Sequence, residues 1–370
     1  MYLYRKTWAE IDLSAIKHNI TEMKKRLLNE TKIFAVVKAD GYGHGAVQVA
    51  ETALEAGANY LAVALLEEAL ELREAGIEAP ILVFGYVGQE GANIAAKNNI
   101  TLTVFHREWL EELDDSPFEE KLNIHLKVDT GMGRLGLRKK EEIDRFLEVL
   151  SNKQNVLLSG VYTHFATADD LKSEIYIKQK ETFNQLIIYM KKNVQEELLV
   201  HTSNSAATIR EPEEAYDAIR FGIAMYGLYP SSSIEKLKAI NLRPAFSLHS
   251  QLTHVKKVEK GSSIGYGASY IAKEDEWIGT VPIGYADGWR RSLQGFNVLV
   301  NGRRCKIVGR ICMDQLMIRL DQNYKIGTKV TLIGVQNGEE ITADEVAEKI
   351  GTINYEIPCM ISHRVPRLYS

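Results

Sequence analysis

A lysine follows an apolar run early in the chain, at a point where its amine has little access to solvent. Lys38 comes directly after FAVV and before ADGYGHG, whose three glycines allow a backbone to approach a ligand closely. A desolvated lysine amine loses its proton readily and can then form a Schiff base with a carbonyl compound. The alternative is a lysine whose amine reaches water along its aliphatic stem. On position alone the alternative is the commoner case, so other segments must distinguish the two.

Polar residues also follow three later apolar runs and are suited to bind an anion beside such a lysine. A histidine lies in GVYTHFA, a serine opens the helix expected in NSAATIRE, and an arginine and a glycine lie in IRFGIAMYG. A hydroxyl at a helix N-terminus can bind phosphate, and it is equally an ordinary cap. A Schiff-base lysine with a phosphate site indicates pyridoxal phosphate, but class I aldolases combine the same two features. The candidates in these runs are His164, Asn204, Ser205, Arg220, Gly222 and Ile223.

A glycine-rich segment, GMGRLG at residues 131–136, matches the dinucleotide-binding spacing G-x-G-x-x-G. The helix expected after it begins too late for that function, and Arg134 occupies the loop. An arginine can bind a carboxylate or a phosphate through two parallel hydrogen bonds, or it can simply be solvated. We therefore treat Arg134 as a candidate anion ligand. The nine histidines show no H-x-x-x-H or H-E-x-x-H spacing, so no metal site is predicted.

Eight short apolar runs alternate with helical patterns through the first part of the chain. Between the runs, apolar residues recur at three- and four-residue spacing, as they do in helices packed on a sheet. This alternation predicts an α/β fold, most simply a (β/α)8 barrel over residues 1–240, with its active site at the carboxyl ends of the strands. The expected strands are 32–37, 60–63, 80–84, 100–104, 121–128, 156–162, 198–202 and 216–220.

The pattern changes near residue 240 to short strands separated by glycine-containing turns, with one short helix in ADEVAEKIG. This pattern predicts a second, mostly β domain over residues 241–370. The segment WAEIDL near the start is not needed for the barrel. The first 12 or so residues are therefore candidates to pair with the β domain.

Composition indicates an ordinary globular protein and excludes several classes of partner. Of the 370 residues 45% are hydrophobic and 25% charged, and the net charge of −4 argues against binding to nucleic acid or to an anionic membrane. Three cysteines are too few for a disulfide framework, which favours the reducing cytoplasm. The opening MYLYRKTWAEIDL lacks the apolar core of a secretory signal. The longest apolar run near the start, residues 60–66, is far shorter than the about 20 residues of a membrane span.

Eight motifs, in order along essentially the whole chain, resemble those of bacterial alanine racemases. They are AVVKADGYGHG, LKVDTGMGRLG, YTHFA, NSAAT, RFGIAMYG, GYGASY, VPIGYADG and GRICMDQ. The resemblance, rather than the spacing, implies the reaction. It is the interconversion of L-alanine and D-alanine with pyridoxal 5′-phosphate, which supplies D-alanine for peptidoglycan.

The resemblance also implies a role for each candidate residue. Lys38 would hold the cofactor as an internal aldimine and act as the base for D-alanine, and Tyr266 would be the base for L-alanine. Arg220 would face the pyridine nitrogen, and His164 would link Arg220 to Tyr266. The lysine that matches Lys127 is carbamylated in several members of the family. The residues expected to bind the cofactor are Lys38, Tyr42, His164, Asn204, Ser205, Arg220, Gly222, Ile223 and Tyr355, and those expected to meet the substrate carboxylate are Arg134 and the backbone of Met313.

Two opposed bases agree with the chemistry of racemisation, because a proton must leave one face of Cα and return to the other. A tyrosine, with an ordinary pKa near ~10, needs a cationic neighbour to act as a base near neutral pH. Since Lys38 and Tyr266 fall in different predicted domains, the resemblance implies a homodimer with composite sites. The alternatives are a pyridoxal-phosphate decarboxylase on a similar plan and a non-catalytic carrier of the cofactor. Arg220 argues against the first, which would use a carboxylate there, and the extra β domain argues against the second.

Overall fold

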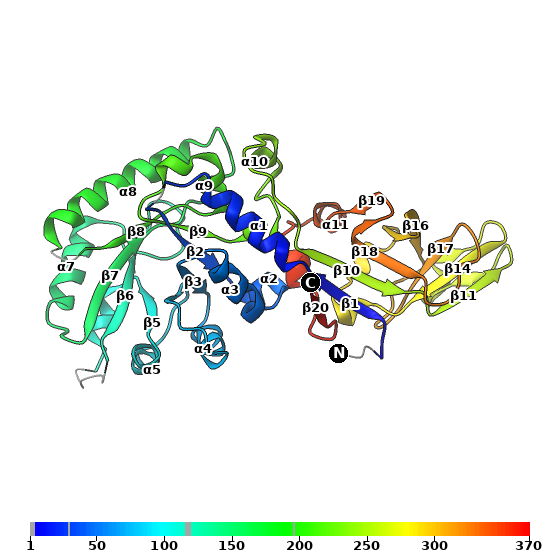
Figure 1. The fold of residues 1–370 in the computed structure, drawn as a ribbon, viewed down its shortest axis with the longest axis horizontal. Helices are drawn as coiled ribbons and strands as arrows, with labels where there is room; N and C mark the ends of the chain where they lie inside the picture. The colour runs from blue at the N-terminus through cyan, green and yellow to red at the C-terminus, as the bar shows by residue number, and fades with distance from the viewer. Residues whose placement is uncertain (1–3, 29, 115–119, 195–196) are drawn as a thin grey trace. The chain divides into compact units, whose positions relative to one another are not determined.

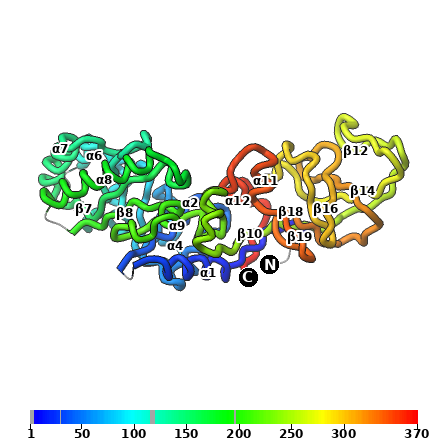
Figure 2. The backbone as a smooth tube through the Cα atoms, turned by 90° about the horizontal axis from the view of Figure 1, so that it is seen from above, coloured from blue at the N-terminus to red at the C-terminus, as the bar shows by residue number. Residues whose placement is uncertain are grey.

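The computed structural model describes residues 4–28, 30–114, 120–194 and 197–370, which form two compact units. The barrel unit comprises residues 15–41 and 46–243. The β unit comprises the chain up to Ser14, residues 42–45 and residues 244–370. In Figures 1 and 2 the barrel unit runs from blue to green, and most of the β unit runs from yellow-green to red.

The barrel unit contains a closed barrel of eight parallel strands in sequence order, which confirms the predicted (β/α)8 fold (Figure 1). Its strands are apolar along most of their length, because side chains fill the interior and helices cover the outside. Each strand that the sequence predicted is present, with ends that differ by two residues at most. The strands are β2 (Lys32–Val36), β3 (Tyr60–Val63), β4 (Ile81–Val83), β5 (Ile100–Val104), β6 (Leu122–Lys127), β7 (Val156–Tyr162), β8 (Leu199–His201) and β9 (Ala218–Phe221).

Helices connect these strands, and a left-handed glycine follows the end of two of them. Gly57 and Gly76 have φ angles of +100° and +86°, and their N–H groups donate to the carbonyls of Leu54 and Arg73. The helices are α1 (Leu13–Lys24), α3 (Ala46–Glu55), α4 (Leu66–Glu74), α5 (Ala92–Lys97), α6 (Arg107–Glu111), α7 (Lys140–Leu150), α8 (Glu174–Asn193), α9 (Ser205–Arg210) and α10 (Ser232–Lys236). Short 3-10 turns are η1 (Gln89–Gly91), η2 (Pro212–Glu214) and η3 (Ile223–Tyr226).

The segment after β2 is helical but left-handed. Within α2 (Lys38–Gly43), Ala39, Asp40 and Tyr42 have φ angles of 53°, 51° and 52°. Each non-glycine residue in this region costs roughly 1–2 kcal/mol, so the turn persists only because its surroundings hold it. Part of that support is local, since the Asp40 carboxylate accepts a hydrogen bond of 2.9 Å from the N–H of Ala46.

The β unit is built on a sheet whose strand order is β11-β14-β17-β16-β15-β18-β10-β1-β20, with β19 paired to β18. The N-terminal strand β1 pairs antiparallel with β10 and parallel with β20. The strands are β1 (Thr7–Ile11), β10 (Phe246–Gln251), β11 (His254–Val258), β14 (Glu276–Val281), β15 (Asn297–Val300), β16 (Arg303–Val308), β17 (Leu316–Leu320), β18 (Lys329–Gln336), β19 (Glu339–Ile341) and β20 (Arg367–Tyr369).

Smaller elements of the β unit carry the residues of functional interest. A two-stranded ribbon of β12 (Ser263–Ile264) and β13 (Tyr270–Ile271) encloses the turn η4 (Tyr266–Ala268). Two further turns, η5 (Tyr285–Asp287) and η6 (Arg291–Leu293), follow β14. The helices are α11 (Ala343–Ile350) and α12 (Glu356–Cys359).

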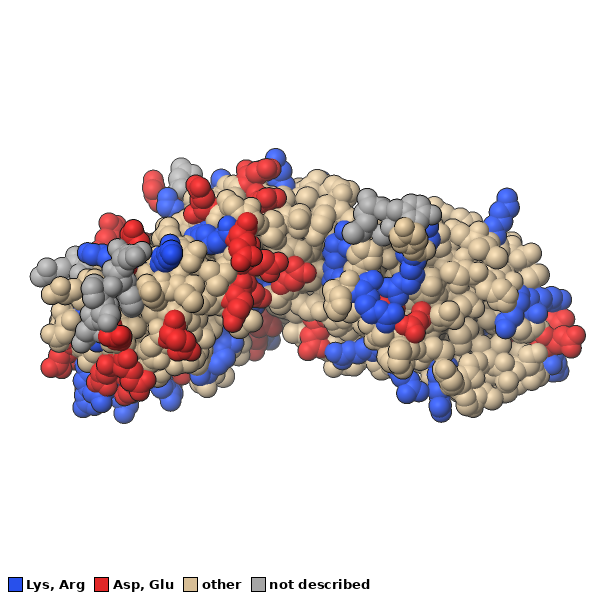
Figure 3. Space-filling model, turned by 90° about the horizontal axis from the view of Figure 1, so that it is seen from below, with Lys and Arg blue, Asp and Glu red and all other residues tan. Residues whose placement is uncertain are grey.

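Acidic and basic side chains both appear on the face shown in Figure 3, in keeping with a net charge of −4. Within the described residues, no helix has the length and apolar character required to cross a membrane.

Candidate active site

Lys38 lies directly after β2, at the end of the barrel where the strands terminate, and its side chain is partly buried. Strand β9 lies beside β2, with Arg220 in register with Phe34. The next segment that the sequence singled out, at the end of β7, carries His164. Burial lowers the pKa of His164 well below its usual value, and the charges of Arg220, Arg134, Lys127 and Lys38 lower it further. Of these groups, Arg220 contacts the imidazole directly, through Nη2 at 3.1 Å from Nδ1.

Arg220 is a buried cation that carbonyl oxygens and imidazole nitrogens hold in place. Its Nη1 donates to the carbonyl of His201 at 3.0 Å and lies 2.9 Å from His201 Nδ1. Its Nη2 donates to the carbonyls of Thr163 and Thr202, each at 2.8 Å, and lies 3.1 Å from His164 Nδ1. No described residue accepts a hydrogen bond from Nε. The guanidinium is thus fixed, with one donor left over.

These contacts determine which nitrogen of each histidine carries the proton. Because arginine only donates, the Nδ1 atoms of His164 and His201 accept, and their protons reside on Nε2. His201 Nε2 then donates to Nδ1 of His125, 3.0 Å away. Burial lowers the pKa of His125 to about 3 and that of His201 well below its usual value. Burial also lowers the pKa of Arg220 to about 10, so at neutral pH a charged guanidinium contacts neutral imidazoles.

The segments that follow β8 and β9 carry hydroxyl and amide groups. The cap of α9 is Asn204, whose side-chain oxygen accepts from the N–H of Ala207 at 3.0 Å. Ser205 is thereby free of the capping role that the sequence left open. Its Oγ lies 3.1 Å from the N of Gly222. Among the described residues, none accepts from the N–H of Ile223, the first residue of η3. Such open amides at the start of a helical turn favour an anion.

Lys127 is the last residue of β6, and Asp129 follows it two residues later. Lys127 is buried, and its Nζ donates to the carbonyl of Val128 at 2.6 Å. Burial lowers the pKa of Lys127 to about 7, with a further contribution from Arg220 that exceeds the opposing effect of Asp129. Burial alone would raise the pKa of Asp129, but hydrogen bonds from Gly133 and its neighbours bring it below the usual value.

The glycine-rich loop at 131–136 is organised by this same carboxylate. The N–H groups of Gly131, Met132 and Gly133 donate to Asp129 Oδ1 at 3.1, 2.9 and 3.0 Å. These amides are therefore not available to a dinucleotide. The side chain of Arg134 is exposed beside them.

Four of the predicted site residues lie in the β unit. Tyr266 opens the turn η4 and is 70% exposed, and Met313 is 52% exposed. The rings of Tyr42 and Tyr355 have centroids 6.4 Å apart. Burial raises the pKa of Tyr42, and Tyr355 adds to the effect, so the Tyr42 hydroxyl remains a hydrogen-bond donor.

Sequence reasoning did not find the histidines behind Arg220. His125 and His201 occupy buried positions within the apolar runs KLNIHLKV and LLVHT. Two imidazoles inside the apolar barrel strands β6 and β8 are an unusual signal, because a buried polar ring requires a hydrogen-bonding partner. The sequence contains that signal, but it does not show which group each imidazole contacts.

Enzymes of the (β/α)8 class carry out their chemistry where the strands end, and the barrel unit gathers its buried cation and titratable groups at that end. The fold and the site therefore define an α/β-barrel enzyme.

Comparison with known proteins gives the family. The chain matches the alanine racemase N-terminal domain over residues 11–230 and the C-terminal domain over residues 245–369. It is 53% identical to an alanine racemase of Anoxybacillus flavithermus over 99% of this chain and 95% of that one. It is 52% identical to alanine racemase 1 of Bacillus subtilis over 99% and 93%. The crystal structure of the Bacillus anthracis alanine racemase with bound L-Ala-P superposes with a TM-score of 0.97 at 50% identity, covering 100% and 96%. The chain belongs to the alanine racemase family and is an amino-acid racemase.

Proposed function

We propose that the protein interconverts L-alanine and D-alanine by a two-base reaction, with pyridoxal 5′-phosphate as its cofactor. The observation that carries this proposal is the environment of Arg220. A buried guanidinium, fixed by three carbonyls and two neutral imidazoles, lies on β9, beside the strand β2 that precedes Lys38. A donor fixed in this way suits a ring nitrogen that accepts a hydrogen bond.

The donors at the ends of β8 and β9 fit a phosphorylated pyridine. The open N–H of Ile223 and the hydroxyl of Ser205 suit a phosphate group, and the Ser205 oxygen accepts a hydrogen bond from the N–H of Gly222. The family resemblance adds the hydroxyls of Tyr42 and Tyr355 to this proposal. The remaining Nε donor of Arg220 suits the pyridine nitrogen. Arg220 keeps its proton at neutral pH, so it donates a hydrogen bond without protonating that nitrogen. When bound, pyridoxal phosphate supplies an electron sink that makes the Cα proton of an amino acid acidic.

Lys38 and Tyr266 are the two bases of the proposal. Lys38 Nζ takes the Cα proton of D-alanine and returns it, and Tyr266 Oη does the same on the L-alanine face. His164 supports the tyrosine. Its Nδ1 accepts from Arg220, so its Nε2–H is the group available to the phenol. A proton removed by one base is replaced by the other, which inverts the carbon.

Arg134 and the N–H of Met313 hold the substrate carboxylate in this proposal.

Lys127 is a buried lysine, and with a pKa of about 7 it has a large neutral fraction at physiological pH. That favours carbamylation of Lys127, in which the neutral amine adds to the carbon of CO2 and releases one proton. The resulting anion would compensate the neighbouring arginines.

The family resemblance supports a homodimer in which each site combines the barrel unit of one subunit with the β unit of the other. A cytoplasmic enzyme that makes D-alanine for peptidoglycan completes the proposal. The 52% and 53% identities to alanine racemases over nearly the whole chain support alanine as the substrate.

A panel of L-amino acids, assayed for D-product, for CO2 release and for the visible absorption of bound cofactor, tests the proposal. We expect D-alanine from L-alanine and a lysine-dependent absorption band. In Lys38→Ala both are lost, whereas Lys32→Ala, an exposed lysine at the start of the same strand, retains both. Release of CO2 without racemisation, or an unchanged band in Lys38→Ala, would overturn the proposal.

A further inference from the structure

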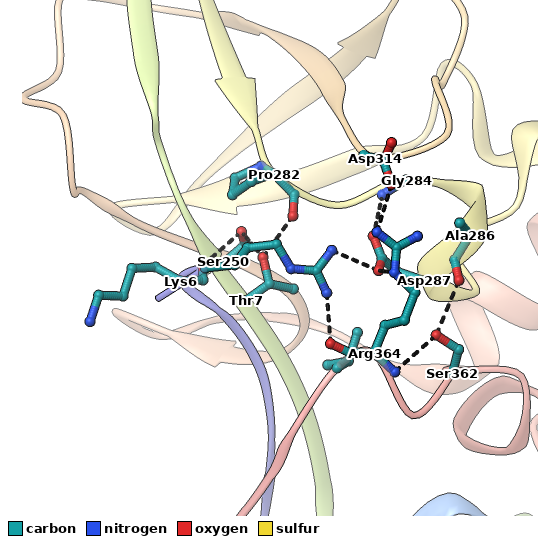
Figure 4. A network of polar contacts seen from close by, with 12 residues as sticks. Lys6, Thr7, Ser250, Pro282, Gly284, Ala286, Asp287, Asp314, Ser362 and Arg364 are labelled. Atoms are coloured by element: carbon teal, nitrogen blue, oxygen red, sulfur yellow. Dashed lines mark hydrogen bonds and ion pairs between the residues drawn. The ribbon is translucent and has the colours of Figure 1, made fainter. Parts of the chain in front are cut away.

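The β unit contains a fully buried carboxylate that the proposed reaction does not use (Figure 4). Asp287 is the last residue of η5, and its Oδ1 accepts a hydrogen bond of 2.7 Å from Arg5 Nη1. Its Oδ2 accepts from the N–H of Gly284 at 3.0 Å. The Nε of Arg364 lies 3.5 Å from Oδ1. A buried ion pair of this kind is often no more stable than an apolar replacement, so stability alone gives little reason for it.

The segment that Asp287 organises lies directly against the segment that carries Met313. The N–H groups of Tyr285 and Ala286 donate to the carbonyls of Cys312 and Met313, both at 3.0 Å. A Cβ placed on Gly284 would lie 2.3 Å from each of these carbonyl oxygens. The two backbones are therefore in contact with no side chain between them, and a movement of one moves the other.

The same network reaches the Met313 segment from its other side. Arg364 Nη2 donates to Asp314 Oδ1 at 2.6 Å, and Arg5 Nη2 donates to the carbonyl of Arg364 at 2.8 Å. Arg364 thus links the carboxylates of Asp287 and Asp314 (Figure 4). Two arginines compensate two aspartates, so the network adds no net charge beside Met313.

Met313 is consequently held by its carbonyl and by its neighbour Asp314, while its own N–H stays open. No residue that the structure describes accepts a hydrogen bond from that N–H. The Met313 N–H shares its planar peptide group with the carbonyl of Cys312, and the N–H of Tyr285 holds that carbonyl, so the direction of the Met313 N–H is fixed as well. We propose that Asp287 is a positioning residue that, through Gly284 and Arg364, aims the N–H of Met313 at the substrate carboxylate. This inference rests on the proposed function, which assigns the carboxylate to that amide.

The role predicts a particular change in kinetics. The carboxylate is present in substrate and transition state alike, so a misdirected amide weakens both to the same extent and raises KM with little change in kcat. A displacement of about 1 Å at such a contact can cost on the order of 100-fold. A purely structural role would instead reduce the folded fraction, which lowers the apparent kcat and leaves KM unchanged.

The experiment compares Asp287→Asn and Asp314→Asn with a matched control, Asp321→Asn. Asp314 is 54% exposed on its side chain, so its amide variant tests the link without a buried change. Asp321 pairs with Arg303 in the same unit and contacts neither segment. We expect KM for both alanine enantiomers to rise about 10- to 100-fold in Asp287→Asn and by a smaller factor in Asp314→Asn. Acetate, a bare carboxylate, should lose affinity in parallel, as followed by its effect on the absorption of the bound cofactor.

Each outcome of the experiment decides the inference. Unchanged KM and acetate affinity in both variants, or a fall in kcat alone, would overturn it. An increase in KM in Asp321→Asn of the same size would also overturn it, because the effect would then not depend on this network. If the unmodified protein does not racemise alanine, the proposed function itself fails, and the acetate measurement still reports on the amide.

Discussion

Replacing Gly160 with alanine should displace the ring of His125, which is hydrogen-bonded to His201, a contact of Arg220. Gly160 lies in β7, in register with His125 of β6. A Cβ at this position would lie 2.5 Å from His125 Nε2 and 2.7 Å from two ring carbons. The backbone of Gly160 does not have a positive φ, so the added methyl acts through its volume alone.

The size of the effect follows from these distances. An ordinary contact begins at 3.4 Å, so the ring must retreat by about 0.9 Å from the 2.5 Å position. The hydrogen bond of 3.0 Å between His125 and His201 is then compressed or broken. Overpacking costs about 1–3 kcal/mol and a lost buried hydrogen bond about 1–3 kcal/mol. We expect the free energy of unfolding to fall by about 2–6 kcal/mol, a large part of the usual total of about 5–15 kcal/mol.

Urea denaturation followed by far-UV circular dichroism measures this loss. Gly338→Ala serves as the control, because no atom lies within 4 Å of its added Cβ and only its φ of +87° opposes the change. The control should cost roughly 1–2 kcal/mol, the price of a left-handed alanine.

A double-mutant cycle gives the decisive result. In a His125→Ala background the ring is absent, so Gly160→Ala should cost almost nothing or stabilise slightly by restricting the unfolded chain. An equal cost in both backgrounds would refute the contact between the methyl group and the imidazole. A cost below about 0.5 kcal/mol in the unmodified background would refute the estimate of overpacking itself.

Three further predictions concern the proposed site. In Tyr266→Phe the rate of racemisation should fall equally in both directions, because the two enantiomers have equal free energy. In D2O the Cα proton of D-alanine should still exchange through Lys38, whereas that of L-alanine should not. Exchange from L-alanine at the rate of the unmodified protein would exclude Tyr266 as a base. Because burial lowers the pKa of Lys127 from its usual 10.5 to about 7, the unfolded chain binds the proton between these values and the folded chain does not, so in CO2-free buffer stability should rise with pH across this window. Lys127→Met should flatten that slope, as urea titrations at several pH values would reveal, and an unchanged slope would contradict the low pKa. Ser205→Ala should weaken pyridoxal phosphate binding about 10- to 100-fold in an equilibrium titration, the loss of a hydrogen bond to a charged group, whereas Ser151→Ala at the exposed end of α7 should not.

The barrel was predictable from the sequence because its signal is local. The runs at 60–63, 100–104 and 156–162 match β3, β5 and β7 residue for residue. Strands buried on both faces must be apolar throughout, and the patterns between them require helices, so the alternation leaves few other folds. The last strand was predicted to begin at residue 216, two residues early. Just before the strand, the side-chain carboxylate of Asp217 accepts from the N–H of Val200 in β8 at 2.7 Å, in place of a strand carbonyl.

Chemical type and position along the chain were likewise local properties. Lys38 after an apolar run and Arg220 two residues before a glycine are visible in the sequence, and the fold places both near strand ends. The left-handed conformation of residues 39–43 is not visible in the sequence, because two of its non-glycine residues, Ala39 and Tyr42, have no preference for that conformation.

Only the tertiary structure decided which groups act together. Arg220 meets His164 and His201, which lie 56 and 19 residues away, and His201 meets His125 at a separation of 76. Asp287 meets Arg5 across 282 residues. Such pairings depend on the register of strands and on the path of loops, which no local pattern of apolar residues specifies. The sequence therefore determined the barrel and the types of its reactive residues, whereas the folded chain decided the protonation of its histidines and the support of its backbone amides.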